Sequence, residues 1–284
     1  MGILLTGRSG QVGSALERAL ARVGDVVAWD RRNADFSNPS SFSTSIQKEN
    51  PAVIVNAAAY TAVDRAEREK DLAFAVNAEA VRRLAEEARK IDALLIHFST
   101  DYVFDGEKPS AYVETDAPNP ASVYGRSKLA GEQAIASSGC RHFIFRTSWV
   151  YTRDGRNFVN AILAAAKTQP ELRVVSDQRG APTSAGMIAA AVARILADPA
   201  LMHRPSGIYH MSAAGETSWH GFAAEVLRHA RLDVPLRAVT TAEYGAAAPR
   251  PKNSLLDNAK LRASFGLALE DWREGFRAAM QAMH

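Results

Sequence analysis

Four side chains that can donate, accept or steer a proton lie in the middle of the chain: Thr100, Asp101, Tyr124 and Lys128. Tyr124 precedes Lys128 by four residues, so on a helix the phenol and the ammonium group lie on the same face. The reference pKa of tyrosine is about 10, and a neighbouring cation or hydroxyl group favours the ionised phenol. We therefore expect Tyr124 to transfer a proton, with Lys128 and Thr100 acting on it, at an oxygen whose carbon gains or loses a hydride.

A strand before Thr100 and a helix after Tyr124 must position these groups. The apolar run at residues 93–96 predicts a buried strand that ends at Phe98. Pro118 and Pro120 interrupt the chain before Tyr124, and the residues after it have a helical pattern. The Tyr-x-x-x-Lys spacing alone is weak evidence, because such pairs on helices usually share no function. Its interpretation depends on the rest of the chain.

Three glycines spaced G-x-x-G-x-x-G follow the first predicted strand, and a helical run follows them. Such glycines let the backbone turn tightly and approach a pyrophosphate, while the helix N-terminus offers oriented N–H groups. The segment therefore predicts a dinucleotide site that contains Gly7, Gly10, Gln11, Val12 and Gly13.

The residues after the second predicted strand bear on the choice of dinucleotide. Asp30 ends this strand, where an acidic residue usually binds the ribose 2′-hydroxyl of NADH. Arg31 and Arg32 follow and could instead hold the 2′-phosphate of NADPH. Asp35, followed by Phe36, either caps the next segment or lies near the adenine, and capping is favoured for Asp35 taken alone. The sequence leaves NADH and NADPH both open.

A near-continuous apolar run at residues 51–56 predicts a parallel strand, and small residues follow it. Ligands of doubly wound sheets bind at such strand ends, where small side chains leave the backbone accessible. The cofactor candidates here are Ala57, Ala58, Ala59 and Thr61, with Phe98 at the end of the next strand.

Composition limits the classes of protein. The chain has 284 residues, of which 47% are hydrophobic and 23% charged, as in ordinary globular proteins. A net charge of +3 gives no electrostatic argument for nucleic acid, and the single cysteine, Cys140, fits a reducing compartment. The chain has no apolar run of the ~18 residues that span a membrane. We expect a cytoplasmic protein whose partner is a small molecule, not a nucleic acid or a membrane.

Seven segments together suggest a family: GILLTGRSGQVGSAL, VIVNAAAYTAVDRAE, IHFSTDYVFDG, ETDAPNPASVYGRSKLAGE, FRTSWVY, DQRGAPTSA and PRPKNSLLD. With them the chain resembles the extended short-chain dehydrogenase/reductases, and among these the dTDP-4-dehydrorhamnose reductases. The resemblance implies an α/β protein with a Rossmann-type doubly wound parallel sheet and a smaller C-terminal α/β substrate lobe. Residues 1–150 would form the NAD(P)-binding domain, with parts of 151–230 returning to it, and 151–284 mainly the substrate lobe.

The resemblance also assigns roles to residues. It implies that Tyr124 is the proton donor, that Lys128 holds the nicotinamide ribose and that Thr100 tunes the tyrosine. Asp101 and Trp149 would contact the sugar, although a tryptophan after a strand is more often a core residue. In the loop at 249–254, two basic residues lie between or beside prolines, which suits either a solvated surface or a diphosphate. The resemblance favours the diphosphate, with Arg250 and Asn253 as the contacts.

The expected activity is the NADPH-dependent reduction of the C4 ketone of dTDP-4-dehydro-L-rhamnose, with NADH as a second cofactor. One alternative is an epimerase, or a reductase of another 4-keto nucleotide sugar, which would use the same Tyr/Lys pair. Another is a regulatory subunit that binds NADP(H) without catalysis. Intact Thr100, Tyr124 and Lys128 argue against this second alternative.

Some members of the family are dimers bridged by Mg²⁺ that glutamates hold. The corresponding positions here are Ala15 and Gly186, which carry no side-chain oxygen. Because Mg²⁺ prefers an octahedral set of oxygens that includes a carboxylate, we expect no metal site and no Mg²⁺ requirement. The protein would be a monomer or a homodimer without a bridging metal.

Overall fold

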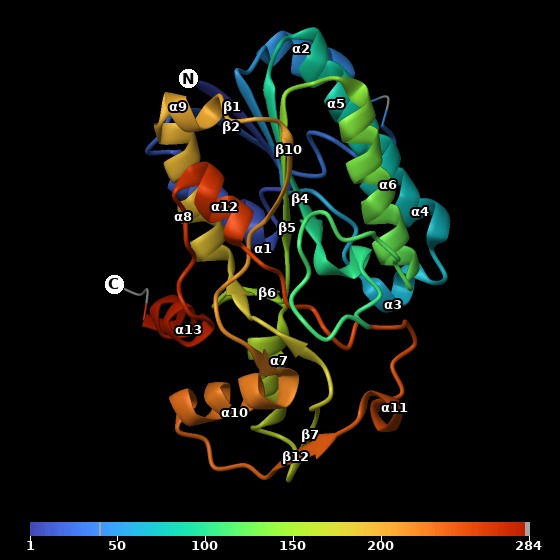
Figure 1. Ribbon diagram of the computed structural model, residues 1–284, viewed down its shortest axis with the longest axis vertical. Coiled ribbons are helices and arrows are strands. Elements are labelled where there is room, and N and C mark those ends of the chain that lie inside the picture. Colours follow the sequence, from blue (N-terminus) through green and yellow to red (C-terminus); the bar gives the residue numbers. More distant parts are fainter. Residues whose placement is uncertain (40, 282–284) are drawn as a thin grey trace.

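The computed structural model describes residues 1–39 and 41–281. Its centre is a six-stranded sheet in the order β10-β5-β4-β3-β1-β2, in which every neighbouring pair is parallel (Figure 1). The strands are β1 (Gly2–Thr6), β2 (Asp25–Trp29), β3 (Val53–Asn56), β4 (Leu94–Thr100), β5 (His142–Thr147) and β10 (Gly207–His210). The predicted doubly wound parallel sheet is confirmed. The strand order reverses between β1 and β3, so ligands are expected at the carboxyl ends of these two strands.

Helices cover both faces of the sheet because the side chains of each strand alternate between them. On one face Ile3, Leu5 and Ile96 pack with α1 (Gln11–Leu20), α8 (Ala185–Ala197) and α12 (Ala259–Phe265). On the other face Leu4 and Leu95 pack with α2 (Ser43–Glu49), α5 (Ala80–Lys90) and α6 (Val123–Ser138). Both faces of β3 and β4 are therefore buried, which explains the near-continuous apolar runs in their sequences.

Short elements join these layers. They are α3 (Val63–Ala66), α4 (Lys70–Phe74), the π-helix η1 (Ala75–Glu79), which leads directly into α5, the 3-10 turn η2 (Asp101–Val103) and α9 (Pro199–Met202). The turn η2 begins at the residue after β4. The strand predicted to end at Phe98 therefore extends to Thr100, and the predicted boundary was wrong by two residues.

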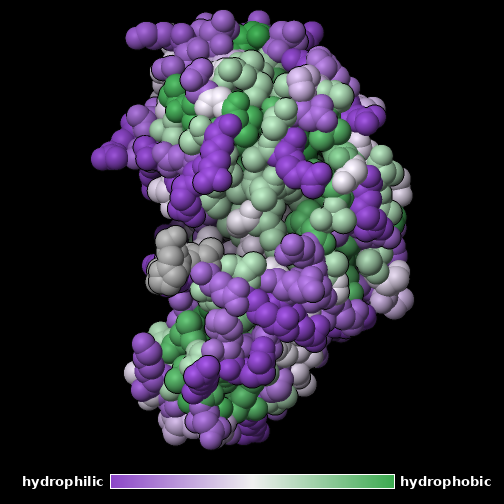
Figure 2. Space-filling view, turned by 90° about the vertical axis from the view of Figure 1, so that its left-hand side faces the viewer, coloured by the Kyte–Doolittle hydropathy of each residue, from purple (hydrophilic) through white to green (hydrophobic). Residues whose placement is uncertain are grey.

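A smaller part of the molecule follows β5 and has its own core around Tyr151, Phe222 and Trp272 (Figure 1). Its elements are β6 (Val150–Tyr151), α7 (Phe158–Ala165), β7 (Leu172–Val175), β8 (Arg179–Gly180), β9 (Thr183–Ser184), β11 (Thr217–Ser218), α10 (Trp219–Ala230), β12 (Leu236–Val239), α11 (Thr241–Tyr244) and α13 (Trp272–Gln281). The chain returns to the larger part as α8 on α1, as β10 beside β5 and again as α12 beside β10. In Figure 2 the outline of the molecule narrows between the two parts.

Candidate active site

The start of α6 places Tyr124 at the carboxyl end of β4. Ser122 is the N-cap of this helix, and its hydroxyl accepts a hydrogen bond from the Gly125 amide at 3.1 Å. Glu67 accepts from the Val123 amide at 2.8 Å, so a carboxylate lies at the positive end of the helix dipole. Two otherwise unpaired amides are thereby satisfied, and the first turn is held in one position.

Close packing fixes the same turn from the other side. A Cβ atom on Gly125 would lie inside contact distance of the Tyr102 carbonyl oxygen, so only glycine lets α6 lie this close to η2. Asn77 of η1 donates to the Ser127 hydroxyl at 2.9 Å, and Ser127 donates to the Tyr124 carbonyl at 2.8 Å. The backbone of Tyr124 is therefore held by Asn77 of η1, by the close approach to η2 and by the hydrogen bonds of Ser122 and Glu67.

The Tyr124 phenol lies among Thr100, Asp101 and Tyr102. Burial raises its pKa above the ordinary value for tyrosine, a hydrogen bond with Thr100 lowers it in part, and the Asp101 carboxylate raises it further. The Tyr102 ring meets the Tyr124 ring edge to face, with centroids 5.4 Å apart. A phenol in this environment keeps its proton near neutral pH, as a proton donor requires.

Lys128 is held against β4. Its Nζ atom donates to the Phe98 carbonyl oxygen at 2.7 Å and lies 3.1 Å from Nε2 of His97. Burial lowers the pKa of this amine to about 8, while Glu132 acts in the opposite direction. The helix places Tyr124 and Lys128 on one face. The charged group that shifts the pKa of the Tyr124 phenol is nevertheless the Asp101 carboxylate, which opposes ionisation of the phenol. We expected Lys128 to favour the phenolate, and the raised pKa of Tyr124 runs against that expectation.

Asp101 is a buried acid beside the phenol. The Thr100 hydroxyl donates to its Oδ1 atom at 3.0 Å, and Oδ2 has no hydrogen-bond partner among the described residues. Burial raises the pKa of this carboxyl group to about 6, and the nearby hydroxyl groups of Ser254 and Thr100 lower it in part. An unpaired oxygen in a buried site can accept a hydrogen bond from a ligand hydroxyl.

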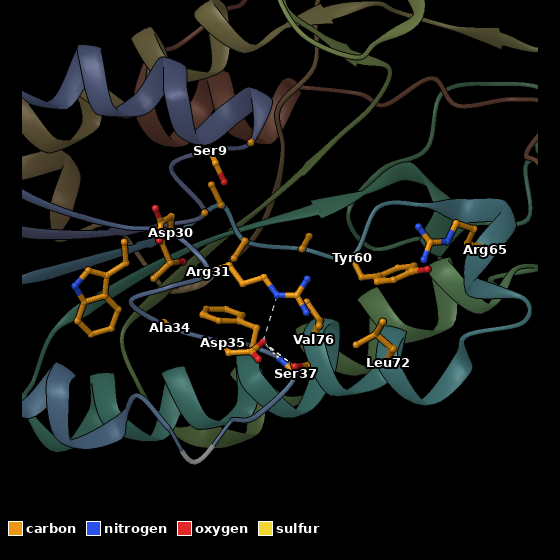
Figure 3. Close-up of a pocket in the computed structure, with 18 residues that line it drawn as sticks. Ser9, Asp30, Arg31, Ala34, Asp35, Ser37, Tyr60, Arg65, Leu72 and Val76 are labelled. Atoms are coloured by element: carbon orange, nitrogen blue, oxygen red, sulfur yellow. Dashed lines mark hydrogen bonds and ion pairs between the residues drawn. The ribbon is translucent and has the colours of Figure 1, made fainter.

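A cavity of about 350 Å³ lies over the glycine loop, at the point where the strand order reverses (Figure 3). Gly7 has φ of +74°, and a Cβ atom there would lie 2.5 Å from the Ala58 amide nitrogen. A Cβ on Gly13 would collide with the Gly7 carbonyl, so this glycine brings α1 close to β1. Predicted cofactor residues that line the cavity are Gly7, Gly10, Asp30, Arg31, Asp35, Phe36, Ala57, Ala58 and Ala59.

The remaining cofactor candidates lie away from this cavity lining. Thr61 is exposed, Phe98 is buried in β4, and Gln11 and Val12 form the first turn of α1 with Gly13. Residues that the sequence analysis missed also line the cavity: Thr6, Ser9, Trp29, Ala34, Ser37, Tyr60, Arg65, Leu72 and Val76. They adjoin predicted segments or come from α3, α4 and η1, to which the sequence analysis assigned no binding role.

The two arginines after Asp30 have different partners. Arg32 donates to Asp30 through its backbone amide at 2.8 Å and its side chain at 2.7 Å, which lowers the pKa of Asp30 to about 2. Arg31 instead extends into the cavity toward Asp35, with Nε 3.6 Å from the carboxylate (Figure 3). The Asp35 carboxylate also accepts hydrogen bonds from the amide and hydroxyl of Ser37, so it stabilises the turn that follows and not the start of a helix.

Trp149 has a strained backbone, with φ of +49°, which is uncommon for a residue with a side chain. Its indole is stacked on Trp219 of α10 with centroids 3.7 Å apart, and it lies so close to Gly180 that a Cβ there would collide with it. The contacts with Trp219 and Gly180 thus fix the orientation of the Trp149 indole. Such strain occurs often at functional sites.

The loop at 249–254 reaches the catalytic stretch, although its two candidate residues have different environments. Arg250 forms a two-point ion pair with Asp64 of α3, at 2.7 and 3.1 Å, and its charge acts on Tyr102. Asn253 is buried, and its amide nitrogen donates to the carbonyls of Lys108 and Ser110 at 2.7 and 2.8 Å. The Arg250 side chain is partly exposed, at 22%, whereas the Asn253 amide holds a neighbouring loop. Substrate binding by either residue stays a prediction.

The fold and this site define a class of protein: a Rossmann-fold oxidoreductase. The family described as RmlD substrate binding domain matches residues 1–284. A dTDP-4-dehydrorhamnose reductase from Shigella flexneri is 43% identical over 293 residues, which cover 100% of this chain and 98% of the relative. Another, from Burkholderia thailandensis, is 45% identical over 286 residues, with 96% of each chain covered. The chain belongs to this family of reductases and is an enzyme.

A solved structure agrees with the comparison of sequences. The dTDP-4-dehydrorhamnose reductase from Bacillus anthracis, whose crystal structure is a complex with NADP, superposes with a TM-score of 0.94 at 36% identity and covers 99% of both chains. Within residues 1–39 and 41–281, no helix is long and apolar enough to cross a membrane. The same residues form no cluster of three or more His, Cys, Asp or Glu side chains suited to a metal ion.

Proposed function

We propose that the enzyme reduces the C4 ketone of dTDP-4-dehydro-β-L-rhamnose to dTDP-β-L-rhamnose, with NADPH as the preferred reductant. The observation that carries the proposal is the partly buried Tyr124 phenol, which lies beside Thr100 and Asp101 at the carboxyl end of β4 and whose pKa is raised there. The full-length similarity to dTDP-4-dehydrorhamnose reductases supports the choice of sugar nucleotide.

The glycine loop fits a dinucleotide. A Cβ at Gly7 would fill the space above Ala58, and the N-cap of α1 is Gly10, which leaves the first amides of the helix free of a side-chain cap. These amides and the helix dipole favour a pyrophosphate. The predicted cofactor contacts of Gln11, Val12 and Gly13 would be of this backbone type. When bound, the reduced nicotinamide supplies the hydride.

The residues after β2 support NADPH over NADH. Because Arg32 already occupies the Asp30 carboxylate, this carboxylate is less available to a ribose 2′-hydroxyl. Arg31 lies in the cavity with an exposed guanidinium group and only a long contact to Asp35, so it is free to pair with a 2′-phosphate. NADH would still bind through the glycine loop, with lower affinity.

The chain's own residues then handle the proton and the substrate. Tyr124 delivers its proton to the C4 oxygen, and Thr100 holds the phenol in place by its hydrogen bond. The free Oδ2 atom of Asp101 accepts from a sugar hydroxyl, and the fixed Trp149 indole forms one wall for the sugar. Residues 151–284 provide most of the substrate lobe, and the enzyme works in the cytoplasm as a monomer or as a homodimer without a bridging metal.

A panel of substrates tests the proposed function. NADPH oxidation is followed with dTDP- and GDP-linked 4-keto sugars, and each active substrate is repeated with NADH. We expect the highest kcat/KM for dTDP-4-dehydro-L-rhamnose with NADPH. A preference for another 4-keto sugar would favour the alternative reductase, and a lack of turnover despite NADPH binding would favour a regulatory subunit.

Arg250→Ala is expected to raise KM for the nucleotide sugar more than it lowers kcat, because Arg250 would neutralise the diphosphate, which is remote from the reacting carbon. Steady-state kinetics measure both constants. Arg228→Ala is the matched control, since Arg228 has a similar two-point pair with Glu225 on the exposed side of α10. An unchanged KM in Arg250→Ala would assign Arg250 to the pairing of Asp64 alone.

Removal of divalent metal is expected to leave both activity and oligomeric state unchanged. The reason is chemical: Ala15 and Gly186 offer no oxygen ligand where a carboxylate would be needed. Dialysis against EDTA, followed by activity and light-scattering measurements, tests this. Loss of activity or of a dimer that Mg²⁺ restores would contradict the prediction.

A further inference from the structure

A chain of buried polar side chains connects the floor of the dinucleotide cavity to Lys128. Thr6 donates to Oδ1 of Asn56 at 2.7 Å, Nδ2 of Asn56 lies 2.9 Å from Nδ1 of His97, and Nε2 of His97 lies 3.1 Å from Nζ of Lys128. The exposed fractions of Thr6, Asn56, His97 and Lys128 are 1%, 1%, 0% and 2%. Buried groups of this kind must satisfy one another, so the direction of each hydrogen bond can be worked out.

The orientation of the Asn56 amide is fixed by a backbone group. The Ala58 amide, which can only donate, lies 3.1 Å from the atom assigned as Oδ1. That atom must therefore be the oxygen, and the nitrogen of the Asn56 amide faces His97. Since this nitrogen donates, Nδ1 of His97 must accept and carries no proton.

The tautomer of His97 follows from this direction. A neutral imidazole without a proton on Nδ1 carries it on Nε2, so an N–H group points at Lys128. An ammonium group on Lys128 has three donors and no acceptor. It could not accept a hydrogen bond from this N–H group, and two donors would face each other. A neutral amine can accept from His97 while it donates to the Phe98 carbonyl at 2.7 Å.

We infer that His97 is a positioning residue whose Nε2–H group holds Lys128 as a neutral amine against β4 in mildly alkaline solution, and that dinucleotide binding releases Lys128 and lets it take up a proton from solvent. The inference deepens the proposed function, because it assumes that the cavity binds NADPH or NADP⁺. It gives His97, Asn56 and Thr6 a shared role, in which they set the charge of Lys128 before the cofactor arrives.

The charges around Lys128 are consistent with this role. Burial keeps the pKa of His97 well below its ordinary value, and a protonated Lys128 lowers it further, so the imidazole is neutral in either state of Lys128. Burial lowers the pKa of Lys128 to about 8, and the charge that acts in the opposite direction, Glu132 one turn along α6, is paired with Arg146 of β5. Tyr124, one turn earlier, is neutral. The phosphates of a bound dinucleotide add negative charge near Lys128 and would raise its pKa.

Proton uptake on binding tests the inference directly. NADP⁺ is titrated by calorimetry at pH 8 in buffers of different ionisation enthalpy, a pH at which its phosphates are already ionised. A group with a pKa of about 8 is half deprotonated there, so the wild type should take up about 0.5 proton, falling toward zero at pH 6. Binding without proton uptake would overturn the inference but not the proposed function, whereas a failure to bind NADP⁺ would overturn the proposed function.

Asn56→Asp should remove the uptake. One carboxylate oxygen keeps the hydrogen bonds from Thr6 and Ala58, while the other accepts from Nδ1–H of His97, so Nε2 becomes an acceptor and favours an ammonium group on Lys128. Asn50→Asp is the control, because it adds the same charge at the exposed end of α2 and should keep the wild-type uptake. Equal uptake in Asn56→Asp and wild type would overturn the inference.

A measurement on the wild type does not depend on whether these variants fold. Imidazole ¹⁵N spectra at pH 8, with the His97 signals assigned by their loss in His97→Gln, report which nitrogen carries the proton. We expect a protonated Nε2 and an unprotonated Nδ1 in the cofactor-free enzyme. A proton on Nδ1 would overturn the inference.

Discussion

Tyr124→Phe is expected to lower kcat by about 10²–10⁴-fold, the usual contribution of a positioned general acid. The phenol is the group that hydrogen-bonds Thr100, and its raised pKa keeps the proton available for the C4 oxygen. Phenylalanine retains the ring that packs on Tyr102, so α6 should stay in place. The affinity for NADPH should be nearly unchanged, because the proposed cofactor contacts are the glycine loop and Lys128, which the substitution leaves in place.

Steady-state NADPH oxidation and direct NADPH binding measure the two parts of this prediction. Tyr209→Phe is the control: Tyr209 is a buried tyrosine of β10 whose hydroxyl donates to the Pro205 carbonyl at 2.6 Å, away from Tyr124. This variant should keep the wild-type kcat. Wild-type turnover in Tyr124→Phe would end the proposed mechanism.

Local patterns were enough to predict the Rossmann-type sheet. The apolar run of β3 and the three glycines at the start of α1 are patterns of residues close in sequence, and both are found as expected. The end of β4 was misplaced because Ser99 and Thr100 are polar, and polar residues usually indicate the end of a buried strand. They continue the strand because they pair with Arg146 and Thr147 of β5, a contact that one sequence does not reveal.

The candidate site was predictable in its residue types and less so in its partners. The environment of Lys128 depends on His97 and Phe98 in the preceding strand, so helical spacing from Tyr124 did not reveal it. Arg250 pairs with Asp64, 186 residues earlier in the chain. The strained backbone of Trp149 has no sequence signal at all, because positive φ is predicted only for glycine and, less often, for asparagine or aspartate.

A buried ion pair fastens the catalytic helix to the sheet, and breaking it should be costly. Arg146 of β5 donates to Glu132 of α6 through two nitrogens, at 2.9 and 2.6 Å, and their side chains are only 1% and 2% exposed. Glu132→Ala leaves the Arg146 charge buried without its partner. The free energy of unfolding should fall by about 3–5 kcal/mol. Chemical denaturation, followed by tryptophan fluorescence, measures the loss.

Two further variants separate the lost charge partner from the lost volume. The double variant Glu132→Leu/Arg146→Met removes both charges and fills the space with apolar groups, so it should recover most of the stability that Glu132→Leu loses. Glu216→Ala breaks a similar two-point pair with Arg179, but their side chains are 52% and 44% exposed, so this loss should stay within about 1 kcal/mol. Equal losses of unfolding free energy in Glu132→Ala and Glu216→Ala would show that burial does not increase the contribution of the ion pair to stability. The position of Tyr124 would then depend on the cap and the close packing at the start of α6, and not on the Glu132–Arg146 pair.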